Sequence, residues 1–282
     1  MIQKQADNLP VIEVLSLFPE INKNLITLLK SLNDKDWCKP TVLPGRTVKY
    51  LASHILNGSL RRLSSCRDNY QVNTPNIKSN EDLVNHIQAL NKVWIEATQW
   101  LSPVLLISFL EFSEHWLYEY FKTLNLDDKA QFSVAWAGET ESSNWFDMAR
   151  EYTEKWHHQM QIRLAVNRPG INSRELFYPA IDTLMRGLPH GYRNTEAALG
   201  CGIEIHIKGE GGGFWFLEKA ETQWQLVKNL KKEPEAKIEM TDDIAWRLFM
   251  DSISRDIAAK SIVILGNRAL GEVVLGTKTV MR

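Results

Sequence analysis

The first 166 residues carry apolar side chains at the spacing of amphipathic helices. The first apolar stripe consists of Ile21, Leu25, Leu28 and Leu32. The polar run at 33–36 that follows this stripe is typical of a turn. After the Pro-Gly pair at 44–45, Thr47 is a suitable N-cap for a second helix that runs to about residue 67. The pattern predicts that this half is a helical bundle.

Further periodic segments follow in the same half. A third helix is expected to open at Ser79 or Asn80 and to end at Pro103. A fourth spans about residues 104–124, and a short alternating piece around 132–136 is expected to be extended. The long helix predicted at about 144–166 carries the residues of most chemical interest.

The chain changes character after a linker-like segment, residues 167–173, that contains Pro, Gly and Asn. One more helix is expected at about 175–188. Short alternating runs then predict antiparallel strands around 203–207, 214–216, 224–226 and 238–240. Two later helices, about 242–251 and 268–280, would cover one face of the sheet. The sequence therefore predicts two domains, a helical (α) domain at 1–170 and a small mixed α/β domain of the α+β type, with an antiparallel sheet, at 171–282.

Composition narrows the class of protein. The chain has 282 residues, of which 44% are hydrophobic and 24% charged, as in ordinary globular proteins. A net charge of −1 lacks the basic excess that nucleic-acid or anionic-membrane binding requires. No apolar run approaches the roughly 18 residues that span a bilayer. Three cysteines without a CxxC spacing, and an N-terminus without a secretory signal, favour a cytoplasmic protein. We expect a monomer or homodimer that acts on a small molecule.

The best candidate for chemistry lies on the helix predicted at 144–166. Glu154 and His158 are four residues apart, so at about 100° per residue they share a face, with Glu151 nearby. His157 falls about 60° to the other side of Glu154 and is a weaker member of the set. A carboxylate and an imidazole one turn apart are how helical bundles build metal sites, with facing helices supplying further ligands.

His54, at the edge of the apolar stripe of the second helix, is the natural third ligand. Two imidazoles and one carboxylate that leave a position open suit zinc or another divalent metal of the catalytic type. Spacing alone leaves the simpler explanations open. Glu and His at this spacing also pair locally on solvated helix faces, and a single histidine at a stripe edge is often only hydrogen-bonded.

The glycine-rich segment 209–213 separates two predicted strands. It lacks the Gly-Lys-Ser/Thr of a phosphate-binding loop, so a hairpin turn is the favoured interpretation. The chain also lacks a GxSxG motif, and none of its cysteines is placed as a nucleophile.

Two motifs resemble a known family. The stretch from Trp37 through the Pro-Gly turn to His54, followed later by Glu154-x-x-x-His158, resembles the mycothiol-dependent maleylpyruvate isomerase family, whose N-terminal part is a DinB-like metal-binding four-helix bundle. The segments after residue 202 look like the sterol-carrier-protein-like domain that follows the bundle in this family.

The resemblance implies that His54, Glu154 and His158 hold a zinc ion that activates a low-molecular-weight thiol, mycothiol or a relative. It also implies an assisting arginine in the C-terminal domain, with Arg268 as first choice and Arg247 as the other. The chain departs from the family pattern at Arg46, where tryptophan is common, and at Gln161, where aspartate is common. Both departures bear on which reaction is catalysed.

The leading hypothesis is a thiol-dependent isomerase or transferase that acts on a small electrophile. The second is metal-assisted hydrolysis, in which Glu151 or His157 serves as the base for a metal-bound water. The third is a non-enzymatic module that keeps a metal in the bundle and binds a lipid in the C-terminal domain.

Overall fold

The structure, a computed structural model, describes residues 9–70, 72 and 80–279. The chain forms two compact units. We call the one that contains residues 15–125 and 158–170 the helical unit, and the one that contains 126–157 and 171–279 the sheet unit. The long helix α6 (Asn144–Ala165) contributes residues to both. Whether 1–170 and 171–282 fold as separate domains stays a prediction.

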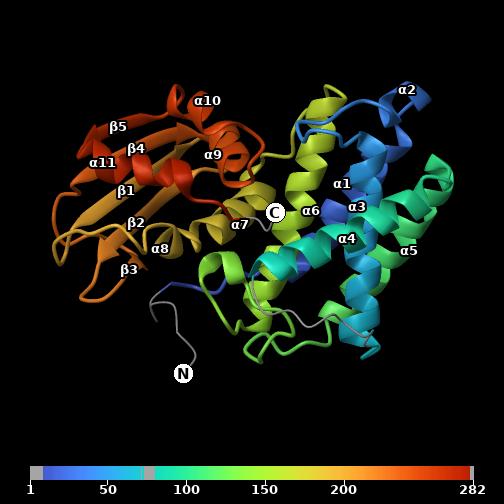
Figure 1. The fold of residues 1–282 in the computed structure, drawn as a ribbon, viewed down its shortest axis with the longest axis horizontal. Coiled ribbons are helices and arrows are strands. Elements are labelled where there is room, and N and C mark those ends of the chain that lie inside the picture. Colours follow the sequence, from blue (N-terminus) through green and yellow to red (C-terminus); the bar gives the residue numbers. More distant parts are fainter. Residues whose placement is uncertain (1–8, 71, 73–79, 280–282) are drawn as a thin grey trace. The chain divides into compact units, whose positions relative to one another are not determined.

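The helical unit is built from the helices that the apolar periodicity predicts and from one short helix, α2 (Asp34–Trp37), at the place where the polar run 33–36 predicted a turn (Figure 1). The others are α1 (Phe18–Lys30), α3 (Val48–Arg62) with a π-helical turn at Leu63–Arg67, α4 (Asn80–Thr98) and α5 (Pro103–Phe121). The turn prediction is wrong because the Asn33 side chain accepts hydrogen bonds from the N–H groups of Lys35 and Asp36 and so caps a helix. A short 3-10 turn at Leu15–Leu17 precedes α1.

Helix starts in this unit follow their capping residues. The Thr47 hydroxyl accepts a hydrogen bond from the Tyr50 N–H at 3.2 Å, so the predicted start of α3 is confirmed. The prediction that Pro103 ends the third helix is wrong. Helix α4 ends at Thr98, and Pro103 is the first residue of α5, where Ser102 is the N-cap. Proline is tolerated there because its missing N–H would have no helical partner. The alternative start at Ser79 lies outside the described residues.

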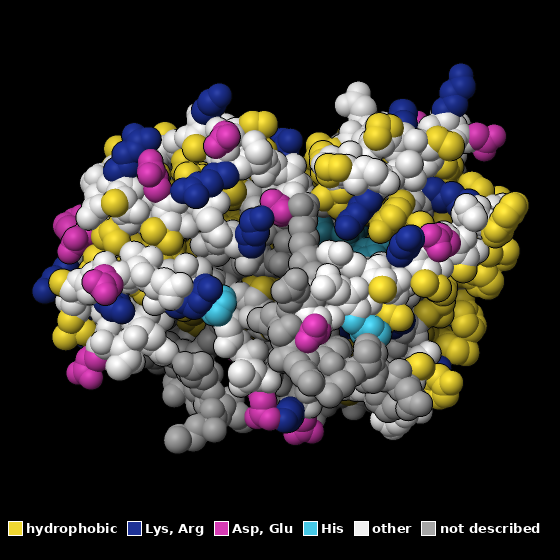
Figure 2. All heavy atoms as spheres, viewed as in Figure 1, with side chains coloured by type: hydrophobic (Ala, Val, Ile, Leu, Met, Phe, Trp, Pro, Cys, Tyr) yellow, Lys and Arg dark blue, Asp and Glu magenta, His cyan; other side chains and the backbone are white. Residues whose placement is uncertain are grey.

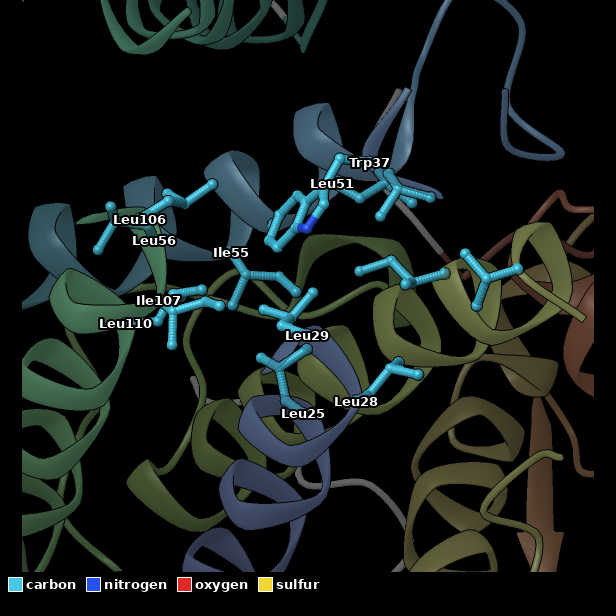
Figure 3. Packing of buried hydrophobic residues seen from close by; sticks show 14 of the residues in the cluster. Leu25, Leu28, Leu29, Trp37, Leu51, Ile55, Leu56, Leu106, Ile107 and Leu110 are labelled. Atoms are coloured by element: carbon cyan, nitrogen blue, oxygen red, sulfur yellow. The ribbon is translucent and has the colours of Figure 1, made fainter. Parts of the chain in front are cut away.

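The core of the helical unit lies between α1, α3 and α5. Figure 3 shows Leu25 and Leu29 of α1 near Ile55 of α3, with Leu110 of α5 beside them. Each fully buried side chain of this size contributes roughly 1.5–3 kcal/mol to folding. Ile162 and Val166, at the C-terminal end of α6, belong to the same cluster. This packing fixes the part of α6 that carries His158 within the helical unit.

The sheet unit contains one five-stranded sheet in the order β3-β2-β1-β4-β5. The strands are β1 (Gly202–Lys208), β2 (Gly213–Lys219), β3 (Trp224–Val227), β4 (Ala236–Thr241) and β5 (Val263–Gly266). Three pairings are antiparallel, but β1 and β4 are parallel, with Ile205 opposite Ile238. The prediction of an antiparallel sheet is therefore wrong for the central pair. After β3 the chain crosses to the edge of β1 that β2 does not occupy, and there β4 runs parallel to β1.

Helices of the sheet unit flank the sheet. They are α7 (Arg174–Met185), α8 (Leu188–Gly191), α9 (Asp242–Phe249), α10 (Arg255–Ala259) and α11 (Arg268–Glu272). Helix α9 packs on β1 and β4, and α11 packs on β4 and β5 (Figure 1). The predicted last helix is shorter than expected. A 3-10 turn at Val273–Gly276 follows α11, and the expected end at Val280 lies outside the described residues.

Two further differences concern short segments. Residues 132–136, expected to be extended, lead into a 3-10 turn at Ala135–Ala137. Strand β5 and helix α10 were not predicted, because four and five residues are too few to show a period. No helix within the described ranges 9–70 and 80–279 is both long and apolar enough to cross a lipid bilayer.

The N-terminal half of α6 is anchored in the sheet unit by Trp156. Its indole N–H donates to the Ile171 carbonyl at 3.1 Å, and its ring centroid lies 5.0 Å from that of Phe177 and 5.8 Å from that of Trp246. Tyr152 adds a hydrogen bond to the Leu176 carbonyl at 2.8 Å. These contacts fix the part of α6 that carries Glu154 and His157, which lie two residues before and one residue after Trp156.

Candidate metal centre

Three potential metal ligands lie within one turn of α6. Glu154, His157 and His158 each offer one ligand atom, and these atoms lie within 4.8 Å of one another. Both histidines are buried, whereas the Glu154 side chain keeps 31% of its surface exposed. The i, i+4 prediction for Glu154 and His158 is thus matched by a local cluster of groups that ligate zinc.

A hydrogen bond orients the His158 ring. Its Nδ1 lies 2.9 Å from the side-chain oxygen of Gln161, one turn later on α6, and Gln161 is fully buried. An amide oxygen only accepts hydrogen bonds, so Nδ1 carries the proton and Nε2 keeps the lone pair. Histidines that bind metals are oriented in this way by an acceptor behind the ring.

His54 lies beside His158 within the helical unit. The two ring centroids are 4.8 Å apart and the ring planes are nearly perpendicular, at 83°. His54 comes from α3, whereas His158 comes from the C-terminal half of α6. The structure therefore brings together the two imidazoles that the sequence assigned to one metal.

His157 is closer to the cluster than its helical angle predicts. Its Nδ1 is 3.2 Å from the Thr153 carbonyl oxygen and 3.9 Å from a carboxylate oxygen of Glu154. Residues three apart on a helix are also neighbours, so Glu154 has one histidine on each side. The angular argument alone underestimated this contact.

Glu151 lies between two basic side chains. Its carboxylate oxygens are 3.8 Å from Lys155 Nζ and 3.8 Å from an Arg150 guanidinium nitrogen. Arg150 is also paired with Asp147 at 2.6 Å. Sequence reasoning missed Lys155, which is only 4% exposed. Its burial depends on tertiary packing, which the helical pattern of polar residues does not report.

The two candidate arginines lie on the sheet unit. Arg268, the first residue of α11, has 82% of its side chain exposed and pairs with Glu272 at 2.7 Å. Arg247 pairs with Asp243 at 3.1 Å on α9. Both contacts join residues one turn apart on a helix, a common local pairing. Arg247 is the more buried of the two arginines, with 27% of its side chain exposed and a buried Nε that has no hydrogen-bond partner among the described residues. A catalytic role for either arginine stays a prediction.

The donor set fits a metal of the kind that the sequence suggests. Two imidazoles and a carboxylate are the ligands of many catalytic zinc sites, which leave a further position for water or substrate. The buried His158 ring, oriented by Gln161, would bind such an ion with a small loss of side-chain entropy. His54, Glu154 and His158 would be the ligands, and His157 is the fourth group at hand.

Comparisons with known proteins give a fold but no close relative. No protein-family model matches the chain, and no curated protein matches its sequence. Two crystal structures of mycothiol-dependent maleylpyruvate isomerase match it over 91% of this chain and 93% of theirs. The sequence identity is 12% in both cases. The TM-scores are 0.54 for that enzyme and 0.53 for a mutant of it in which a histidine is replaced by alanine.

A third solved structure, the UbiJ-SCP2 ubiquinone synthesis protein, covers 27% of this chain and 67% of its own, with 13% identity and a TM-score of 0.22. That score is too low to support the sterol-carrier-like interpretation of the C-terminal part. The similarity along 91% of the chain is what identifies the architecture. The chain has the fold of mycothiol-dependent maleylpyruvate isomerase.

Proposed function

We propose that this protein is a metal- and thiol-dependent isomerase or transferase that acts on a small electrophile. The observation that carries the proposal is the pairing of His54 with His158, whose rings lie 4.8 Å apart, with Glu154 one turn before His158 on α6. The chain also has the fold of an enzyme named for its dependence on mycothiol.

His54, Glu154 and His158 would hold a divalent metal, with zinc as the expected ion. When bound, the metal would keep a low-molecular-weight thiol, mycothiol or a relative, as a thiolate near neutral pH, able to add to an activated double bond and later to leave. The residues of the chain then have three tasks: to orient the ligands, to handle the proton of the thiol, and to place the electrophile.

Orientation of the ligands is assigned to Gln161. Its side-chain oxygen fixes the tautomer of His158, so that Nε2 is available to the metal. An amide is a weaker acceptor than the aspartate common in the family. We expect this difference behind His158 to alter the preferred substrate or thiol.

Handling of the proton is assigned to His157. Its Nδ1 faces the Thr153 carbonyl oxygen, which favours the tautomer with the proton on Nδ1 and the lone pair on Nε2. Such an imidazole accepts a proton near neutral pH and returns it later, as the cycle of thiol addition and loss requires. Glu151, held between Lys155 and Arg150, is expected to orient these two side chains.

The proposal is tested by turnover of the zinc-loaded chain. Maleylpyruvate is supplied with mycothiol, with glutathione or with no thiol, and its isomerisation is followed by absorbance. We expect activity that needs a thiol, is lost in His158→Ala and is unchanged in His115→Ala, which alters an exposed histidine on α5.

Two other results would replace the proposal. Cleavage of esters or amides without a thiol would favour the metal-assisted hydrolase. A lipid retained through purification, together with no turnover on maleylpyruvate or haloaromatic electrophiles and no change in Glu154→Ala, would favour a non-enzymatic binding module.

A further inference from the structure

The sheet unit contains a cavity that no residue of α6 lines. It has a volume of about 490 Å³, which lies in the range of small-molecule sites, roughly 300–1,000 Å³. Its walls come from the start of α7 and from the hairpin that joins β1 to β2. Its lining includes the side chains of Arg174, Tyr178, His206, Lys208 and Phe214.

The glycine-rich segment 209–213 forms the hairpin at the edge of this cavity. A Cβ atom at Gly212 would lie 2.0 Å from the Ile207 carbonyl oxygen, and one at Gly211 would lie 2.5 Å from the Phe177 ring. Only glycine permits such close approaches. The hairpin interpretation is thus confirmed, and Gly212 and Gly213 line the cavity with backbone only.

The same hairpin positions a guanidinium group. Arg174 donates from Nη1 to the Gly212 carbonyl at 2.8 Å, and its guanidinium carbon lies 4.5 Å from the centre of the Tyr178 ring. A guanidinium has five N–H donors, so this bond leaves most of them for a ligand. Within the described part of the chain, the structure shows no ion pair between Arg174 and a carboxylate.

Charged groups of both signs surround the cavity, because the Asp242 carboxylate lies beside Gly209, one of the lining residues. Lys208 and His206, both on β1, share one carboxylate, that of Glu239 on the neighbouring strand β4, at 2.6 Å and 3.6 Å. No acidic side chain lines the cavity among the described residues. Arg174 therefore adds a positive charge that Glu239 does not neutralise. An anion is a suitable ligand because the Arg174 guanidinium has N–H donors left for it.

Aromatic rings supply the apolar wall. Phe214 stacks on the His206 ring, with centroids 4.1 Å apart and planes within 9°, and Tyr178 stacks on Trp215 at 5.7 Å. Phe214 is 53% exposed, so a large ring at the cavity faces solvent. Flat aromatic surfaces beside hydrogen-bond donors suit a planar ligand that has an apolar body and a charged end.

We propose that this cavity binds a small planar organic carboxylate. Arg174 receives the carboxylate as a two-point partner, Lys208 adds a second positive charge, and the apolar body of the ligand lies against Tyr178 and Phe214. A guanidinium matches the planar geometry of a carboxylate through two parallel N–H donors. None of the proposed metal ligands lines this cavity, so binding of a carboxylate here does not depend on the catalytic proposal.

The test is a titration of the full-length, isotope-labelled chain followed by NMR. The probes are benzoate, its uncharged analogue benzamide, and phenyl phosphate. We expect benzoate to shift the backbone amide signals of Gly212, Gly213 and Phe214 in a saturable way. Benzamide should bind at least about tenfold more weakly, because it cannot form the charge-assisted pair. Tighter binding of phenyl phosphate than of benzoate would overturn the assignment to a carboxylate.

Variants separate the site from general charge effects. Arg174→Gln should weaken benzoate binding about tenfold or more, and Lys208→Gln should weaken it less. Arg255→Gln, which removes an exposed arginine of α10 that does not line the cavity, should change nothing. The amide spectrum of each variant reports its folding. Equal binding of benzoate and benzamide, or unchanged binding in both Arg174→Gln and Lys208→Gln, would refute the proposal.

Discussion

The Nδ1 atom of His158 lies 2.9 Å from the side-chain oxygen of Gln161. This contact connects the sequence to the proposed chemistry, because it sets which nitrogen of the ring can reach a metal. Gln161 stands at a position where aspartate is common in the maleylpyruvate isomerase family that the sequence resembles. Glutamine offers a hydrogen-bond acceptor without a negative charge, and this acceptor orients the ring.

Gln161→Leu removes the acceptor and keeps most of the side-chain volume. We expect its zinc affinity to fall by about 10- to 100-fold, the usual effect of losing a partner behind a ligand histidine. Zinc competition against a coloured chelator measures the change. Gln161→Glu is the matched control, because it keeps the acceptor and adds charge, and its affinity should equal or exceed that of the unchanged chain. Equal affinities in all three proteins would show that the contact does not support metal binding.

Lys155 is the buried partner of Glu151 on α6, with Nζ 3.8 Å from the carboxylate. Lys155→Met removes this buried basic partner of the carboxylate, so we expect the free energy of unfolding in urea to fall by about 3–5 kcal/mol. Lys237→Met is the control, because Lys237 is 40% exposed and its partner Glu233 is 91% exposed. An exposed pair of that kind contributes about 0–1 kcal/mol. Similar losses in the two variants would contradict a structural role for the buried pair.

His190 is expected to make the protein less stable in mild acid. Burial of the ring, and then the charge of Arg193, lower the pKa of His190 below its usual value. The unfolded chain therefore binds a proton more readily than the folded one. Stability is fully present above the unfolded pKa, about 6.5, and is lost as the pH falls from there toward the folded pKa.

An NMR titration of the imidazole signals measures this pKa directly. Melting temperatures at pH 5 and pH 7 should differ less in His190→Gln than in the unchanged chain, whereas His115→Gln should leave the difference as it is. A pKa for His190 at or above about 6.5 would show that this histidine does not contribute to acid sensitivity.

The sequence predicted elements best where periodicity and a capping residue agree. Thr47 and the apolar spacing that follows located α3, and the stripe of Ile21, Leu25 and Leu28 is buried. Helix α5 carries apolar residues on more than one side. Leu106, Leu110 and Leu117 are buried, whereas Phe109 and Phe112 are exposed, and Figure 2 shows hydrophobic side chains gathered at the edge of the molecule where α5 lies. Spacing alone could not decide which side faces the core.

The direction of β4 relative to β1 could not be predicted, for a different reason. Alternation in Ile238 and Met240 shows that the strand has one buried face, but the same alternation fits a parallel or an antiparallel neighbour. Whether the pairing is parallel depends on the connection between β3 and β4. Residues 228–235 form no helix, and a helix is the usual sign of a crossover to a parallel strand.

The sequence predicts part of the geometry of the candidate site, whereas its role stays a prediction. The i, i+4 spacing of Glu154 and His158 is local and therefore readable from the sequence. His54 was predicted as a further ligand from its place at the edge of an apolar stripe and from a resemblance. Its contact with His158 could not be derived, because the packing of α3 against the end of α6 is a tertiary property. The buried state of Lys155 is tertiary for the same reason, and the exposure of Arg268 gave no sequence signal.

The metal content of the purified chain tests the central claim most directly. The chain is loaded with zinc, freed of unbound metal and analysed for zinc per protein, together with His54→Ala, His158→Ala and the control His115→Ala. The account predicts about one zinc ion per chain in the unchanged protein and the control, and a large loss in the other two variants. Absence of bound zinc after loading, or an equal amount in all four proteins, would contradict it.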